Sequence, residues 1–131
     1  RNLNASCFVR VPFTAAGTAG FTSASLLMRY NDGFRAWLNG APLAASNAPA
    51  SPVWNSTATA ARATDASLVS TGYNITAALP GLINGTNLLA IQGLNIAAAD
   101  SSFLVLPVRA VPSTSVSAPA AGSMSPSPVP R

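Results

Sequence analysis

The chain has 131 residues, of which 49% are hydrophobic, and its charged residues are seven arginines and three aspartates, with no histidine. This length predicts one domain with a sizeable core. Acid–base catalysis draws mostly on histidine, glutamate or lysine, all of them missing here, and Asp32, Asp65 and Asp100 lie far apart in the chain. We therefore expect no enzyme. The arginines are scattered along the sequence, which argues against a nucleic-acid-binding protein.

Cysteine and histidine usage limits the chemistry further. Cys7 is the single cysteine, so the sequence predicts neither an internal disulfide nor a metal site, and no cofactor is expected. Every apolar run is interrupted by Ser, Asn, Gly or Pro well before the roughly 18 residues that a membrane span needs. We therefore expect no membrane span.

Alternation with a period of two predicts the first strands. In "CFVRVPF", residues 7–13, apolar side chains at the odd positions share one face and Phe8 and Arg10 fall on the other. "SASLLMRY", residues 23–30, alternates in the same way, with apolar side chains at the even positions. Both patterns are typical of half-buried strands.

Two turns follow. "NDG" at 31–33 predicts a tight turn, and "FRAWLNG" at 34–40 the return strand of a hairpin, with Trp37 in the core. "NG" at 39–40 predicts a second turn into a short strand. The side chain of Asp32 is expected to bind nearby backbone amides in the first turn.

The rest of the chain completes an all-β pattern. Residues 46–65 form a long loop that holds Trp54, and residues 87–96 and 102–111 are the two strongest strands. Many short strands separated by turns predict a jelly-roll β-sandwich over residues 1–111. Residues 112–131, rich in Pro, Ser and Ala, form an extended C-terminal strand or tail outside it.

Four Asn-X-Ser/Thr sequons predict possible N-glycosylation sites on the surface. A composition so rich in Ser and Thr produces several sequons by chance, so the excess is mild. The Ser- and Pro-rich tail is typical of O-glycosylated stalks and adds to the same prediction. We expect an extracellular or cell-surface location. The four sequon asparagines are Asn4, Asn55, Asn74 and Asn84.

Three stretches carry a resemblance to a known family. "RYNDGFRAWLNG" at 29–40, "APASPVWNSTAT" at 48–59 and "GTNLLAIQGLN" at 85–95 resemble the galactose-binding-like jelly-roll modules of secreted and cell-surface proteins. These modules also occur beside glycosidase catalytic domains. The resemblance spans residues 5–110 and implies the jelly-roll fold. It leaves function open, because this fold hosts sugar-binding and structural roles alike.

One function open to such a module is carbohydrate binding. Tryptophan and tyrosine rings stack on pyranose rings, and arginine hydrogen-bonds their hydroxyls. The candidate glycan contacts are Tyr30, Arg35 and Trp54. The competing interpretation of Trp54 is that it pins the long loop to the body of the domain.

The tail suggests another function. Residues 113–118, between two prolines, are long enough for a strand that alternates small apolar residues with serines. Twenty extended residues span about 65 Å, so this strand reaches a groove or open sheet edge of an adjacent copy. A head-to-tail contact of this kind that does not close builds a filament. The expected polymerisation strand is Ser113, Thr114, Ser115, Val116, Ser117 and Ala118.

The sequence favours this second function over the first. The expectation is a non-catalytic structural subunit of an extracellular fibre, whose partners are copies of itself and possibly glycans. A surface with few charges suits assembly. The alternatives are a tail that folds back along its own sandwich and a carbohydrate-binding module within a secreted multidomain protein.

Overall fold

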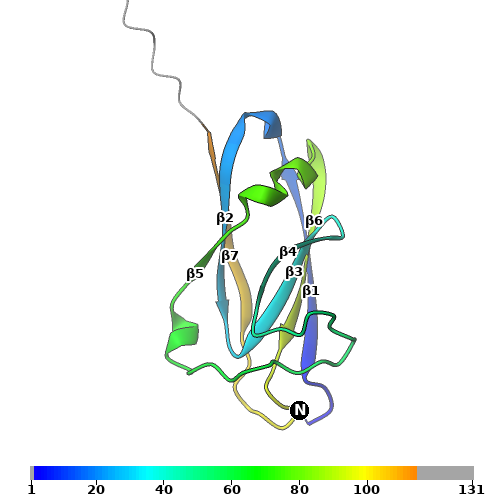
Figure 1. Cartoon of the computed structure of the whole chain (residues 1–131), viewed down its shortest axis with the longest axis vertical. Coiled ribbons are helices and arrows are strands. Elements are labelled where there is room, and N and C mark those ends of the chain that lie inside the picture. Colours follow the sequence, from blue (N-terminus) through cyan, green and yellow to red (C-terminus); the bar gives the residue numbers. More distant parts are fainter. Residues whose placement is uncertain (1, 115–131) are drawn as a thin grey trace, which may run out of the picture.

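A computed structural model describes residues 2–114, which form two antiparallel sheets packed face to face (Figure 1). One sheet has the order β1-β6-β3-β4 and the other the order β5-β2-β7. The all-β sandwich expected from the sequence is confirmed. The strands are β1 (Ser6–Ala15), β2 (Phe21–Tyr30), β3 (Gly33–Leu38), β4 (Ala41–Ser46), β5 (Thr71–Asn74), β6 (Gly85–Leu94) and β7 (Val105–Thr114).

Three short 3₁₀ helices connect the strands: η1 (Thr18–Gly20), η2 (Ala66–Leu68) and η3 (Thr76–Gly81). None of the helices in residues 2–114 is long and apolar enough to cross a membrane. The β1–β2 connection and η3 lie at one end of the sandwich, called here the η3 end, and the N-terminal segment and the β2–β3 turn lie at the other (Figure 1).

The core lies between the inner faces of the two sheets. The expected alternation of β2 is confirmed, because its even-numbered side chains from Ala24 to Tyr30 are buried. Phe34 of β3 is fully buried and packs edge to face against Tyr30, with ring centroids 4.8 Å apart. It meets the ring of Tyr73 from β5 in the same way at 5.1 Å. These three rings join the sheets at the centre of the sandwich.

The expected hairpin of β2 and β3 is wrong. β2 pairs with β5 and β7, whereas β3 pairs with β4 and β6, so the two strands lie in different sheets. The turn at Asn31 and Asp32 is a corner that carries the chain across the sandwich, and it lets both strands turn their apolar faces inward. The expected second turn is confirmed. It joins β3 to β4 with positive φ at Asn39 (50°) and Gly40 (86°), as a two-residue hairpin requires.

Trp37 is not a core residue, contrary to expectation. Phe34, Ala36 and Leu38 of β3 are buried, so the intervening Arg35 and Trp37 face outward and are half-buried. Since side chains alternate along a strand, Trp37 must share the face of Arg35 rather than that of its two neighbours.

β7 runs three residues beyond the expected end of the domain at residue 111. Ser113 pairs with Ser23 and Thr114 with Phe21, both on β2 of the same chain. The first two residues of the expected polymerisation strand therefore belong to the domain's own sheet. The other four, Ser115 to Ala118, lie outside the described residues.

Candidate functional site

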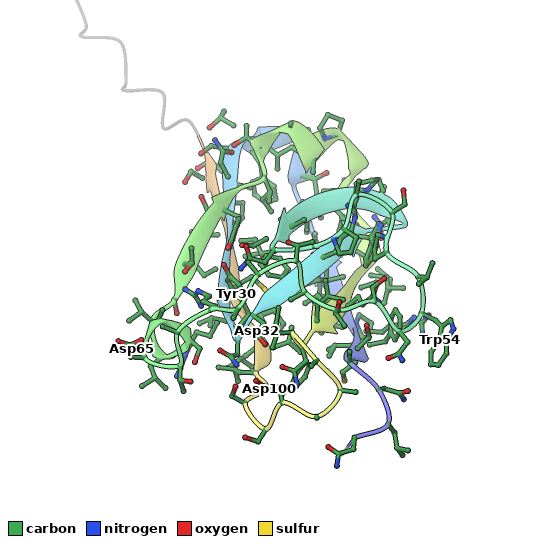
Figure 2. All side chains as sticks on the ribbon, turned by 60° about the horizontal axis from the view of Figure 1, so that its bottom comes forward. Tyr30, Asp32, Trp54, Asp65 and Asp100 are labelled. Atoms are coloured by element: carbon green, nitrogen blue, oxygen red, sulfur yellow. The ribbon has the colours of Figure 1, made fainter. Side chains whose placement is uncertain are left out.

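Three segments meet at the end of the sandwich opposite the η3 end: residues 2–5, the loop after β4 and the loop between β6 and β7. The amide of Ala5 donates to Oδ1 of Asn55 at 2.7 Å, and its carbonyl accepts from the amide of Asn95 at 2.7 Å. The amide of Ala58 donates to the carbonyl of Asn95 at 2.9 Å. This loop end, seen in Figure 2, is therefore held together by long-range hydrogen bonds.

Asp32 anchors two of these loops. Its carboxylate is buried, with 2% of the residue exposed, and lies in the middle of the loop end (Figure 2). Oδ1 accepts from the amide of Arg62 at 3.0 Å and Oδ2 from the amide of Ile96 at 2.8 Å. The sequence correctly indicated that Asp32 binds backbone amides, but these amides belong to distant loops rather than to its own turn.

Tyr30 is buried and cannot contact a bound sugar, so its prediction as a glycan contact is wrong. The residue is 4% exposed, and the guanidinium of Arg62 lies 4.2 Å from its ring centroid. Its hydroxyl donates to Oγ of Ser46 at 2.8 Å and accepts from the hydroxyl of Tyr73 at 2.6 Å. Burial, together with the hydrogen bond to Tyr30, raises the pKa of Tyr73 to about 12.

Trp54 is 71% exposed and stands out at the edge of the loop end (Figure 2). The backbone beneath it is fixed, because the amide of Val53 donates to Oγ of Ser56 at 2.9 Å. The carbonyl of Val53 accepts from Nε2 of the buried Gln92 at 2.8 Å. Neighbours of Trp54 thus pin the loop, while its indole remains open to solvent.

A polar hollow of about 340 Å³ opens at this end. Two of its lining residues, the half-buried Asp100 and the 42% exposed Phe103, are not among the glycan contacts expected from the sequence. Oδ1 of Asp100 accepts from the amide and the hydroxyl of Ser102 at 2.7 and 2.6 Å, and these bonds lower the pKa of the carboxyl. The lining residues are Asn4, Ala5, Ser6, Cys7, Asn95, Ala98, Asp100, Ser101 and Phe103.

Two side-chain oxygens near the hollow have no hydrogen-bond partner within the described part of the chain: Oδ1 of Asn31 and Oδ1 of Asn95. Nδ2 of Asn31 donates to the carbonyl and hydroxyl of Ser102, and Nδ2 of Asn95 to the carbonyl of Asp100. The amides thus hold the 95–104 loop in place while their oxygens remain unpaired. Asn95 directly follows β6, which ends at Leu94, two residues before the expected end of this strand.

Arg35 lies away from this hollow, on the outer face of the four-stranded sheet. Its Nη1 donates to the carbonyls of Pro49 and Ala50 at 3.2 and 2.9 Å, and its guanidinium lies 5.9 Å from the ring centroid of Trp37. The three expected glycan contacts therefore occupy three settings: Tyr30 in the core, Arg35 on a sheet face and Trp54 on a loop.

The sequon asparagines lie at or near the surface. Asn4, Asn74 and Asn84 are exposed and Asn55 is half-buried. Asn55, Asn74 and Asn84 use Oδ1 as an acceptor, from the amides of Ala5, Thr76 and Thr18. A glycan would be attached through the amide nitrogen instead, so these hydrogen bonds neither support nor exclude glycosylation. The four sites stay predictions.

The η3 end contains a second space of about 340 Å³, called here the apolar cavity. Phe13 and Leu89 line it from one sheet, and Phe21 and Leu26 from the other. Pro112, close to the end of β7, also lines it. Its walls are almost entirely apolar, in contrast to the polar hollow.

Comparison with known proteins assigns no family to this chain. No protein-family model and no curated protein matches the chain. Among solved structures, a β-D-mannosidase from Dictyoglomus thermophilum is 14% identical with a TM-score of 0.43, over 70% of this chain and 9% of that one. A Streptomyces avermitilis α-L-rhamnosidase complexed with L-rhamnose is 13% identical with a TM-score of 0.49, over 88% and 11%. At these scores neither likeness bears on the function of this chain.

Proposed function

We propose that the chain is a carbohydrate-binding module of the galactose-binding-like kind, and that it holds a sugar in the polar hollow at its loop end. The observation that carries this proposal is that an aromatic ring, Phe103, and a carboxylate, Asp100, line the same hollow of about 340 Å³. Volumes of this order are typical of small-molecule sites, which combine an apolar surface with a few polar groups. A pyranose presents the same combination, because its ring hydrogens form apolar patches between the hydroxyls.

The hydrogen bonds around Asp100 prepare it for this role. Two bonds from Ser102 to Oδ1 lower the pKa of Asp100 and so favour its ionised form further, and the remaining lone pairs of the carboxylate are available to accept from sugar hydroxyls. Asn4 and Ser101, both exposed, add an amide and a hydroxyl to the lining. The long-range bonds of the loop end hold these groups in place before binding, which reduces the entropic cost of association.

Charge narrows the class of sugar. Among the described residues that line the hollow, Asp100 is the only one whose side chain is ionised at neutral pH. A carboxylate repels uronic acids and sulfated sugars and attracts protonated amines. The hollow therefore selects neutral or amine-bearing sugars.

A glycan array probed with the full chain and an Asp100→Asn variant tests this proposal. The amide oxygen of the variant still accepts from Ser102, so the loop is kept while the charge is removed. Neutral or amino sugars are expected to bind the parent chain and to lose about tenfold in affinity in the variant, since a charged hydrogen bond contributes about 1.5–3 kcal/mol. Asp65→Asn, which changes the exposed cap of η2, is the matched control. Absence of glycan binding, or equal loss in both variants, would overturn the proposal.

A second candidate, the fibre subunit, draws support from the apolar cavity. Ala110 and Pro112 of β7 line this cavity, so it lies at the end of the sandwich where the described part of the chain ends. The tail is then a source of apolar side chains such as Val116 for the cavity of an adjacent copy. Electron microscopy of the full chain beside a chain ending at Thr114, which keeps β7 whole, tests this. Filaments only from the full chain support it, and monodisperse particles from both contradict it.

A further inference from the structure

Two arginines and two aromatic rings share the outer face of the four-stranded sheet. The register places Arg10 of β1, Ala90 of β6 and Trp37 of β3 side by side in one row. The adjacent row, two residues along each strand, contains Phe8, Gln92 and Arg35. All six side chains point to the same face, because residues two apart on a strand do so.

A small residue separates the two large side chains of the first row. Ala90 carries only a methyl group between Arg10 and Trp37, whose strands are about 10 Å apart at two strand spacings. The loop after β4 bounds the second row, where Gln92 donates to the carbonyl of Val53 and Arg35 to that of Ala50. Ala90 therefore lies between a cation on one side and an indole on the other.

Among residues 2–114, the positive charge on this face has no acidic counterpart nearby. Within residues 2–114 all three aspartates lie at the loop end: Asp32 is buried there, Asp65 caps η2 and Asp100 lines the polar hollow. Arg10 is exposed. Arg35 is bound only by neutral carbonyls, which leave its charge uncompensated, and its guanidinium is held near the ring of Trp37.

We propose that this face binds an acidic polysaccharide, with the carboxylate or sulfate groups on Arg10 and Arg35 and a sugar ring against Trp37. Guanidinium groups suit these anions, because their planar array of donors matches paired oxygens. An indole ring offers a flat apolar surface to the ring hydrogens of a pyranose. The site is separate from the polar hollow and does not depend on it, since the hollow carries a carboxylate that repels the same ligands.

The test is calorimetric titration of the full chain with three polysaccharides of similar length. Polygalacturonate carries carboxylates, heparin mainly sulfates, and dextran no charge. We expect that at least one acidic polysaccharide binds, that its binding weakens with added salt, and that dextran does not bind. Comparison of polygalacturonate with heparin also shows whether carboxylates or sulfates are preferred.

Variants locate the site. Arg10→Gln removes an exposed charge and is expected to weaken acidic-polysaccharide binding about tenfold. Trp37→Ala tests the stacking surface and is expected to weaken it several-fold. Arg29→Gln removes the same charge from β2 of the other sheet and is the matched control, expected to change the affinity less than twofold.

The inference is overturned by no binding of either acidic polysaccharide, by equal binding of dextran, or by an equal loss from Arg29→Gln and Arg10→Gln, which would indicate diffuse attraction to net charge. Asp100→Asn is expected to leave acidic-polysaccharide binding unchanged. If Asp100→Asn abolishes it, the ligand occupies the polar hollow and the inference fails, whereas failure on this face alone leaves the function proposed for the hollow intact.

Discussion

The two ends of the sandwich enclose spaces of the same volume, about 340 Å³, with opposite chemistry. At the loop end, buried polar groups such as Asp32 and Gln92 hold the loops to the sheets through side-chain to backbone bonds. At the η3 end, Phe13, Leu26 and Leu89 surround a cavity that they do not fill. The loop end thus gains stability from directional hydrogen bonds that also fix a polar surface. The η3 end relies on apolar packing, and this packing is incomplete around the cavity.

The largest expected effect is the loss of the anchor at the loop end. Asp32→Ala leaves the part-buried amides of Arg62 and Ile96 without their charged acceptor and should lower the free energy of unfolding by about 3–5 kcal/mol. Urea unfolding measures it. Asp65→Ala removes one exposed cap bond and should cost only about 0.5–1 kcal/mol. If the two variants are equally stable, the loop end is not anchored as described.

A smaller loss is expected at the apolar end. Leu89→Ala removes a buried side chain that already faces the apolar cavity and should cost about 2–3 kcal/mol. This is the low end of the usual range, because the void exists before the change. Ile91→Ala, in the closed core on the same strand, is the comparison and should cost more. A larger loss for Leu89→Ala would show that the η3 end is tightly packed.

Filling the apolar cavity should stabilise the protein. Ala24 of β2 is buried and lines the cavity, so Ala24→Val places two methyl groups into open space and is expected to add about 0.5–1 kcal/mol. Ala45→Val, on an exposed position of β4, accounts for the strand preference of valine alone. The melting temperatures of both variants, measured by calorimetry, test whether cavity filling stabilises the protein. A gain from Ala45→Val equal to that from Ala24→Val would remove cavity filling as the cause.

The last expected effect is a dependence on alkaline pH near the centre of the sandwich, which solvent screening reduces because Tyr73 is only half-buried. The pKa of Tyr73 is raised from 10.0 to about 12, so folding favours the protonated phenol. The stabilisation is therefore complete below pH 10 and is lost as the pH rises through 12. Unfolding in urea at pH 9 and pH 11.5 should show this decrease. It should be smaller in Tyr73→Phe, and an identical decrease in that variant would exclude Tyr73 as the source.

Local patterns predicted the strands well and the contacts between them poorly. The alternation of residues 23–30 was enough to give the buried face of β2, and "NG" at 39–40 gave the β3–β4 turn. The same alternation does not distinguish a hairpin within one sheet from a corner between two, which is why the β2–β3 connection was misassigned. For Trp37 the alternation pattern already contained the correct answer. Trp37 lies two residues after Arg35 in the strand, so the two side chains share the outer face.

The candidate site was harder to predict because its residues meet only through long-range contacts. Asp32 binds amides 30 and 64 positions away in the chain. Asn4 and Phe103 line the same hollow from opposite ends of the sequence, and neither carries a local motif. Trp54 was visible as a loop aromatic, yet its exposure depends on how Ser56 and Gln92 hold the neighbouring Val53.

The most direct test of the sugar-binding hollow is a set of amide ¹H–¹⁵N spectra of the full chain, recorded while a panel of neutral and amino sugars is added. We predict that a binding sugar shifts the signals of Asn4, Ser101 and Phe103, at the lining of the polar hollow, and leaves those of Ala24 and Ala78, at the apolar cavity, unchanged. Shifts centred on the apolar cavity, or no saturable shift with any sugar of the panel, would contradict the proposed function.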